Sequence, residues 1–148
     1  MAKDCLILPS SGVDLGSIVK LAETAVTLGI SNKSLADFQF CLGLVEYRQG
    51  NFVSAVDWVR KSLDHPLDPA DSNRELEAYM VLAMAHHQLG HRDEARVAFA
   101  NGVEIAETKL PRLDSGDLGE DWPDWIIAHT LLDEAKTRIN RQPGTNKE

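Results

Sequence analysis

Three histidines within six residues are the first candidates for chemistry in this chain. His86, His87 and His91 stand in the segment Ala-His-His-Gln-Leu-Gly-His, and imidazole nitrogens are common zinc ligands. On a helix that ends at Gly90, His86 would face the core, His87 would face the opposite side and His91 would lie beyond the turn. The three rings are therefore not expected to converge, and no metal site is predicted.

The carboxylates also lack a catalytic arrangement. Asp114, Asp117, Glu120 and Asp121 form an acidic stretch, but their spacing lacks the order of a calcium-binding loop. The glycines make no phosphate-binding fingerprint, and the chain has no Gly-x-Ser-x-Gly elbow and no Cys/His nucleophile arrangement at a known spacing. The sequence therefore predicts a protein that is not an enzyme and has no cofactor.

One pattern appears twice, at an offset of 40 residues. Each copy has a large residue, a Leu followed by a small residue, a turn Gly, and an Ala with an apolar residue four positions on. In sequence order these residues are Gln39, Leu42, Gly43, Gly50, Ala55 and Val59, then Tyr79, Leu82, Ala83, Gly90, Ala95 and Phe99. The spacing resembles that of tetratricopeptide (TPR) proteins, and the resemblance implies a helical scaffold for binding.

Apolar periodicity and turn signals place the expected helices at about residues 15–28, 34–49, 52–64, 72–88, 92–107 and 121–140. The expected fold is all-α: a TPR-like α-solenoid of antiparallel helix hairpins with a C-terminal capping helix. The repeats are expected at about 34–68 and 72–107. The capping helix, at about 121–140, is expected to turn Trp125, Ile126, Leu131 and Leu132 inward.

The expected domain covers residues 1–140 and is followed by a disordered tail at 141–148. The start, at residues 5–8, resembles the end of a helix from a preceding TPR unit, so the chain is expected to be a piece of a longer polypeptide.

Local signals predict two helix starts and one close contact. Ser34 with Asp37, and Ser72 with Glu75, are typical of capping boxes. Gly102 falls in mid-helix, where it costs about 1 kcal/mol relative to Ala, so we expect another helix to pack closely against it.

The TPR resemblance also implies a concave groove lined by the first helix of each repeat. The residues at the groove positions are Asp37, Phe40, Leu44, Tyr47, Arg48, Glu77, Met80, Met84, His87 and Gln88. The Lys and Asn side chains with which chaperone-binding TPR proteins hold a terminal carboxylate are replaced by Phe40, Leu44, Val81 and Met84. The set is apolar at its centre, which predicts an apolar or helical peptide as the ligand. In the alternative interpretation, flanking segments of the chain or another copy cover these residues.

The composition of the chain excludes some classes of binding partner. The formal charge of −8 and the pI near 5.0 oppose binding to nucleic acid and to membrane surfaces. The two cysteines and the absence of a recognisable secretory leader predict a cytoplasmic protein. A protein or peptide partner is expected, and a homo-oligomer stays open.

A closer resemblance is carried by two segments, Leu42 to Trp58 and Leu82 to Arg96, of which Ala-His-His-Gln-Leu-Gly-His is the most specific part. They are similar to the C-terminal TPR regions of planctomycete-type bacterial serine/threonine protein kinases. The resemblance implies an accessory interaction region of a signalling protein. It implies no kinase activity, because the kinase motifs are absent from these residues.

Overall fold

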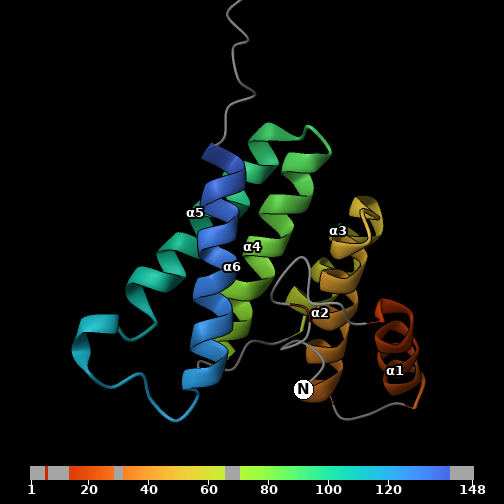
Figure 1. Cartoon of the computed structure of the whole chain (residues 1–148), viewed down its shortest axis with the longest axis horizontal. Coiled ribbons are helices and arrows are strands. Elements are labelled where there is room, and N and C mark those ends of the chain that lie inside the picture. Colours follow the sequence, from red (N-terminus) through yellow and green to blue (C-terminus); the bar gives the residue numbers. More distant parts are fainter. Residues whose placement is uncertain (1–5, 7–13, 29–31, 66–70, 141–148) are drawn as a thin grey trace, which may run out of the picture.

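The computed structural model describes residues 6, 14–28, 32–65 and 71–140, and every regular element in them is helical (Figure 1). In order these are α1 (Leu15–Thr27), α2 (Asn32–Arg48), α3 (Phe52–Leu63), α4 (Ser72–Gln88), α5 (Arg92–Thr108), the short 3-10 helix η3 (Leu113–Ser115) and α6 (Trp122–Asn140). The all-α prediction is confirmed. The predicted tail at 141–148 lies outside the described residues, as does the start of the chain apart from Leu6.

Two equivalent turns build the hairpins α2–α3 and α4–α5. Gly50 has a φ of +83°; its N–H donates to the Tyr47 carbonyl (3.1 Å), and the next N–H, from Asn51, donates to the Glu46 carbonyl (2.9 Å). The same pair of hydrogen bonds recurs at Gly90, where φ is +78°. This Schellman motif needs a left-handed residue, and Gly adopts that conformation without a Cβ clash. The repeat seen in the sequence is therefore a repeat of helix ends.

Two helical glycines mark close contacts between neighbouring helices. A methyl group on Gly43 would lie 3.2 Å from the backbone N of Val59 and 3.3 Å from the carbonyl O of Ala55, so α2 and α3 meet backbone to backbone. A methyl group on Gly102 would overlap the end of the Met80 side chain. The close packing predicted at Gly102 is confirmed, although its neighbour there is a flexible side chain.

Of the two predicted capping boxes, the one at Ser72 does not form, and the side chain of Ser34 lies outside the described part of the structure. α2 begins two residues before Ser34, which therefore lies inside the first turn. α4 begins at Ser72 itself, with Asp71 in the cap position and no side-chain capping hydrogen bond. The Glu75 carboxylate instead accepts a hydrogen bond from Lys109 Nζ at 2.9 Å, which ties the start of α4 to the end of α5.

α4 is the central helix. It packs against α3, α5 and α6 and also touches α2, and 12 of its 17 residues are buried. A helix that is buried on all sides needs neighbours all around it. Figure 1 shows α6 lying alongside α4, with α2 and α3 on the other side and α1 beyond them.

α6 follows the second hairpin as the predicted last helix, but its buried face differs from the prediction in one residue. Trp125, Leu131 and Leu132 are buried, whereas Ile126 is 43% exposed and Ile127 is buried in its place. Consecutive residues on a helix point about 100° apart, so Trp125 and Ile126 cannot share the centre of one face. α6 packs mainly on α4 and barely touches α5.

We expect Gly43→Ala to destabilise the chain more than Gly102→Ala. Both changes gain the same helix propensity, about 1 kcal/mol. At Gly43 the added methyl group meets α3 backbone, which cannot rotate away, and overpacking of this kind costs about 1 to 3 kcal/mol. At Gly102 the end of Met80 can move. Urea unfolding followed by circular dichroism measures both; equal stability of the two variants would contradict the backbone contact.

Candidate functional site

The residues predicted to line the groove lie on α2 and α4, but most of their side chains are buried. Six of them are no more than 5% exposed: Phe40, Leu44, Tyr47, Glu77, Met80 and Met84. The Arg48 side chain is 4% exposed. Asp37 and Gln88 are exposed and His87 is partly exposed. The structure therefore brings the centre of the predicted groove together inside its own core and leaves three of its rim residues in contact with solvent.

The cover over this surface comes from the same chain. α6 packs on α4, and the guanidinium of its Arg138 lies 5.9 Å from the centre of the Tyr47 ring on α2. Leu6 is buried in the same apolar cluster. α6 therefore covers the part of the predicted groove around Tyr47 and Arg48, whereas the end of Met80 packs against Gly102 of α5. This arrangement corresponds to the interpretation of internal cover.

A bidentate ion pair between Arg48 and Glu134 connects α6 to α2. Arg48 Nη1 and Nη2 donate to the two carboxylate oxygens of Glu134 at 2.7 and 2.8 Å. Arg48 Nε donates to the Leu6 carbonyl at 2.9 Å, and Arg138 Nε donates to Glu134 Oε1 at 2.8 Å. Bidentate pairs of this kind are short, strong and specific in geometry. Arg48 was predicted as a rim contact for a partner; here its partner is α6.

The pair changes the titration of Glu134. Burial alone would raise the pKa of this carboxyl, but the hydrogen bonds and charges of Arg48 and Arg138 outweigh burial and bring the pKa below its ordinary value. Burial raises the pKa of the neighbouring Tyr47 hydroxyl, so this side chain stays neutral. α6 is therefore attached through an ionised carboxylate at neutral pH.

Two of the three histidines in the Ala-His-His segment, His86 and His91, lie in contact with each other. His86 Nδ1 lies 3.2 Å from His91 Nδ1, and His86 Nε2 lies 3.4 Å from Arg60 Nη2. Because a guanidinium can only donate, His86 Nε2 is the acceptor, its Nδ1 carries the proton, and His91 Nδ1 accepts it. Burial, Arg60 and His91 all lower the pKa of His86. Within the residues that the structure describes, no three His, Cys, Asp or Glu side chains gather as metal ligands.

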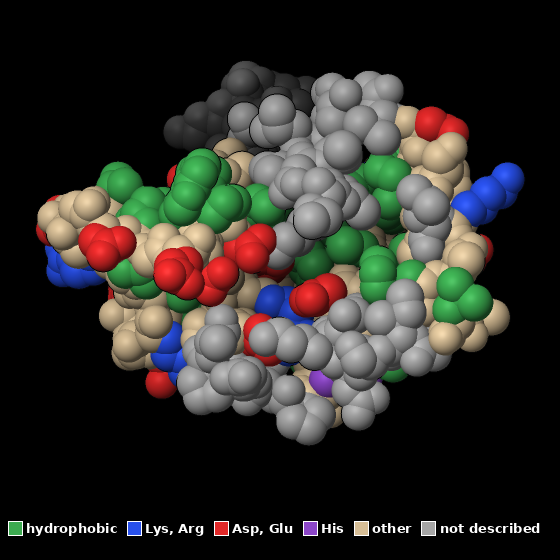
Figure 2. Space-filling model, turned by 90° about the horizontal axis from the view of Figure 1, so that it is seen from below, with side chains coloured by type: hydrophobic (Ala, Val, Ile, Leu, Met, Phe, Trp, Pro, Cys, Tyr) green, Lys and Arg blue, Asp and Glu red, His purple; other side chains and the backbone are tan. Residues whose placement is uncertain are grey.

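A second surface lies between α5, the following connection and α6. We call it the α5–α6 cleft; its volume is about 1090 Å³. Its lining residues are Ala106, Glu107, Pro111, Arg112, Leu113, Asp114, Trp125, Ile126, His129, Thr130 and Asp133. Figure 2 shows hydrophobic and acidic side chains next to each other on the side of the molecule where Figure 1 places this connection.

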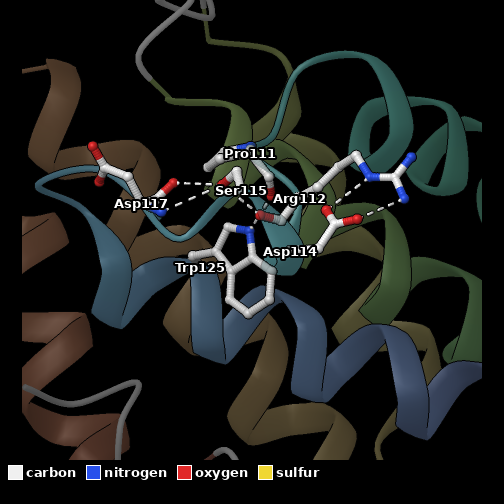
Figure 3. A network of polar contacts seen from close by, with 6 residues as sticks. All are labelled: Pro111, Arg112, Asp114, Ser115, Asp117 and Trp125. Atoms are coloured by element: carbon white, nitrogen blue, oxygen red, sulfur yellow. Dashed lines mark hydrogen bonds and ion pairs between the residues drawn. The ribbon is translucent and has the colours of Figure 1, made fainter.

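Polar contacts fix the wall of the cleft (Figure 3). Trp125 Nε1 donates to the Pro111 carbonyl at 2.8 Å. The Trp125 ring also stacks on His129, with ring centres 3.7 Å apart. The Ser115 hydroxyl donates to the Arg112 carbonyl at 2.6 Å, and a left-handed Gly116 follows. The connection between α5 and α6 thus contains one short helix, η3, beside the residue that bonds to α6.

Sequence reasoning missed this cleft because its walls come from segments that pair only in the fold. One signal was present: Leu113 and Trp122 are large apolar residues in and beside an otherwise acidic stretch. Both are more than half exposed.

We expect Glu134→Gln to lower the free energy of unfolding by about 2 kcal/mol at pH 7, because it removes the carboxylate that accepts two hydrogen bonds from the nearly buried Arg48. The folded-state pKa of Glu134 is depressed, so the stabilisation is complete above the unfolded value of about 4.3 and is lost as pH falls through the folded value. The gap between wild type and variant should therefore narrow in acid. Urea unfolding at a series of pH values measures it.

The matched control is Asp133→Asn. Asp133 is 80% exposed and lies 4.0 Å from Lys136, so its removal should change stability little. A Glu134→Gln variant as stable as Asp133→Asn at pH 7 would show that the ion pair does not hold α6.

Comparisons with known proteins support the fold and leave the partner open. Residues 39–110 match the family model described as anaphase-promoting complex subunit 5, a TPR-like helical repeat family. No curated protein and no solved structure matches the chain. None of the helices in the described ranges has the length and apolar character needed to cross a membrane. The match covers α3, α4, α5 and the second part of α2, and this chain folds as a TPR-like α-solenoid closed by α6.

Proposed function

We propose that this chain is a non-catalytic module that binds a protein or peptide partner. Its TPR-like hairpins support this proposal, because such repeats generally present surfaces for other proteins. The family matched over residues 39–110 is named for a subunit of a complex, so that family works within an assembly of proteins.

The observation that carries the proposal is the helix in the groove. α6 places Ala128, Leu131, Leu132 and Ala135 in the core, at the i, i+3, i+4, i+7 spacing of a helix laid in a groove. Glu134 adds one carboxylate opposite Arg48. The surface of α2 and α4 that α6 covers is thus a site for an amphipathic helix carrying one acidic residue, and α6 is the occupant supplied by the chain itself.

A partner would have to compete with α6. A segment tethered by a short connection has an effective concentration in the millimolar range, so most molecules keep α6 in place. A substitution that makes the docking of α6 about 2 kcal/mol less favourable raises the fraction of molecules with an open groove about 30-fold. Access to the groove therefore depends on the strength of the Arg48–Glu134 pair.

Self-association is the second candidate. The complementarity of α6 and the groove within one chain means that α6 of one copy fits the groove of another. Sedimentation across a range of concentrations distinguishes the two: self-association gives a mass that rises with concentration.

The test uses a fluorescent peptide with the sequence of residues 121–140 as the probe. We expect weak binding to the wild-type chain and binding about 30-fold tighter to Glu134→Gln, whose groove opens more often. Fluorescence anisotropy measures both affinities at pH 7. The labelled peptide retains its own glutamate and can pair with Arg48.

Asp133→Asn is again the control and should bind the peptide as weakly as wild type does. Circular dichroism must show that each variant is folded. Equal affinity of the peptide for Glu134→Gln and Asp133→Asn would refute the groove as an exchangeable helix-binding site.

The setting of the module is proposed from sequence resemblance alone. The segments at 42–58 and 82–96 favour an accessory region of a bacterial signalling protein that works in the cytoplasm. Purification of the native protein from its source cells, with mass spectrometry of what accompanies it, tests this setting. Complexes that never contain a signalling protein would count against it.

A further inference from the structure

We infer that the α5–α6 cleft docks a basic amphipathic helix of a partner protein. This surface lies outside the groove and is open while α6 is in place. The inference goes beyond the proposed groove function and rests on the shape, the apolar lining and the charge of the cleft.

The shape suits one helix. α5 and α6 barely touch each other, and the Trp125–Pro111 hydrogen bond of 2.8 Å keeps the connection against α6 at the side of the gap. A helix with its side chains is about 10 Å across, so the volume of about 1090 Å³ has room for about two turns. In a longer solenoid, another helix would pack on this end of the stack.

The lining contains apolar groups that face solvent. Leu113 is 73% exposed and Ile126 is 43% exposed. Neighbouring exposed apolar side chains are typical of a surface that binds another molecule. Burial of a Leu or Ile side chain yields about 1.5 to 3 kcal/mol, so these residues supply attraction to the apolar face of a helix.

The charge of the cleft selects a basic partner. Glu107, Asp114 and Asp133 line it, and its one basic lining residue, Arg112, is paired with Asp114 at 3.1 Å. Seven carboxylates and two basic residues lie between positions 104 and 124, so this stretch carries five of the eight excess negative charges of the chain. Lys or Arg side chains at the edges of a docked helix would lie near these carboxylates, whereas an acidic helix would be repelled by them.

The cleft and the groove are linked through α6. Leu131 faces the core from this helix, while Ile126 and Asp133 face the cleft. The cleft therefore exists only while α6 is docked. A ligand in the cleft should hold α6 in the groove, and by linkage a loosened α6 should weaken the cleft.

The experiment uses the full chain and two labelled 14-residue peptides with Leu at helical spacing, one with Lys and one with Glu at the remaining positions. We expect the Leu/Lys peptide to bind and the Leu/Glu peptide not to bind. The double variant Leu113→Lys/Ile126→Lys should weaken Leu/Lys binding at least about tenfold. Val53→Lys is the matched control, because Val53 is 63% exposed on α3, outside the cleft, and should leave the affinity within about twofold.

Glu134→Gln separates this inference from the groove proposal. This variant should bind the Leu/Lys peptide more weakly and the α6 peptide more tightly than the wild-type chain does. The two affinities are measured separately, so either proposal can be refuted without the other. An equal loss of affinity for the Leu/Lys peptide in Val53→Lys and in the double variant would overturn the inference, since it would show that the basic peptide binds through the overall negative charge of the protein. Tighter Leu/Lys binding to Glu134→Gln, or a dimer of the chain that the double variant abolishes, would also overturn it.

Discussion

The need to bury α4 on every side is the constraint on which the rest of the structure depends. From Ala78 to Ala85 this helix has no charged residue, so no face of it can be left to water. α3 and α5 cover it as the hairpin repeat requires, and α6 covers the remaining side. The last helix lies where it does because α4 would otherwise leave one apolar side without cover.

Apolar burial and the Arg48–Glu134 pair have different parts in placing α6. Burial of three large residues, Ile127, Leu131 and Leu132, yields roughly 5 to 9 kcal/mol, which exceeds the roughly 1.5 to 3 kcal/mol expected from a charge-assisted hydrogen bond. The attraction is therefore mainly hydrophobic. The pair sets the register, because a shift of one residue would turn Glu134 about 100° away from Arg48.

Much of the fold was predictable because its signals are local. The turn glycines at 50 and 90 and the apolar periodicity each act over a few residues, and every helix ends within two residues of its expected bounds. The capping box at Ser72 failed because a long-range contact, Lys109 with Glu75, takes the same carboxylate. The groove residues were placed on the predicted helices, but local signals carry no information about what lies above them.

The sequence by itself determined a TPR-like all-α solenoid with two hairpins and a final helix, since helix period and turn geometry are written in neighbouring residues. It also left internal cover of the groove open as one of two interpretations. Only the tertiary structure decided that α6 packs on α4 and pairs with Arg48 of α2, and that a cleft remains beside α5. Both depend on residues such as Arg48 and Glu134, which are 86 positions apart and meet only when the chain has folded.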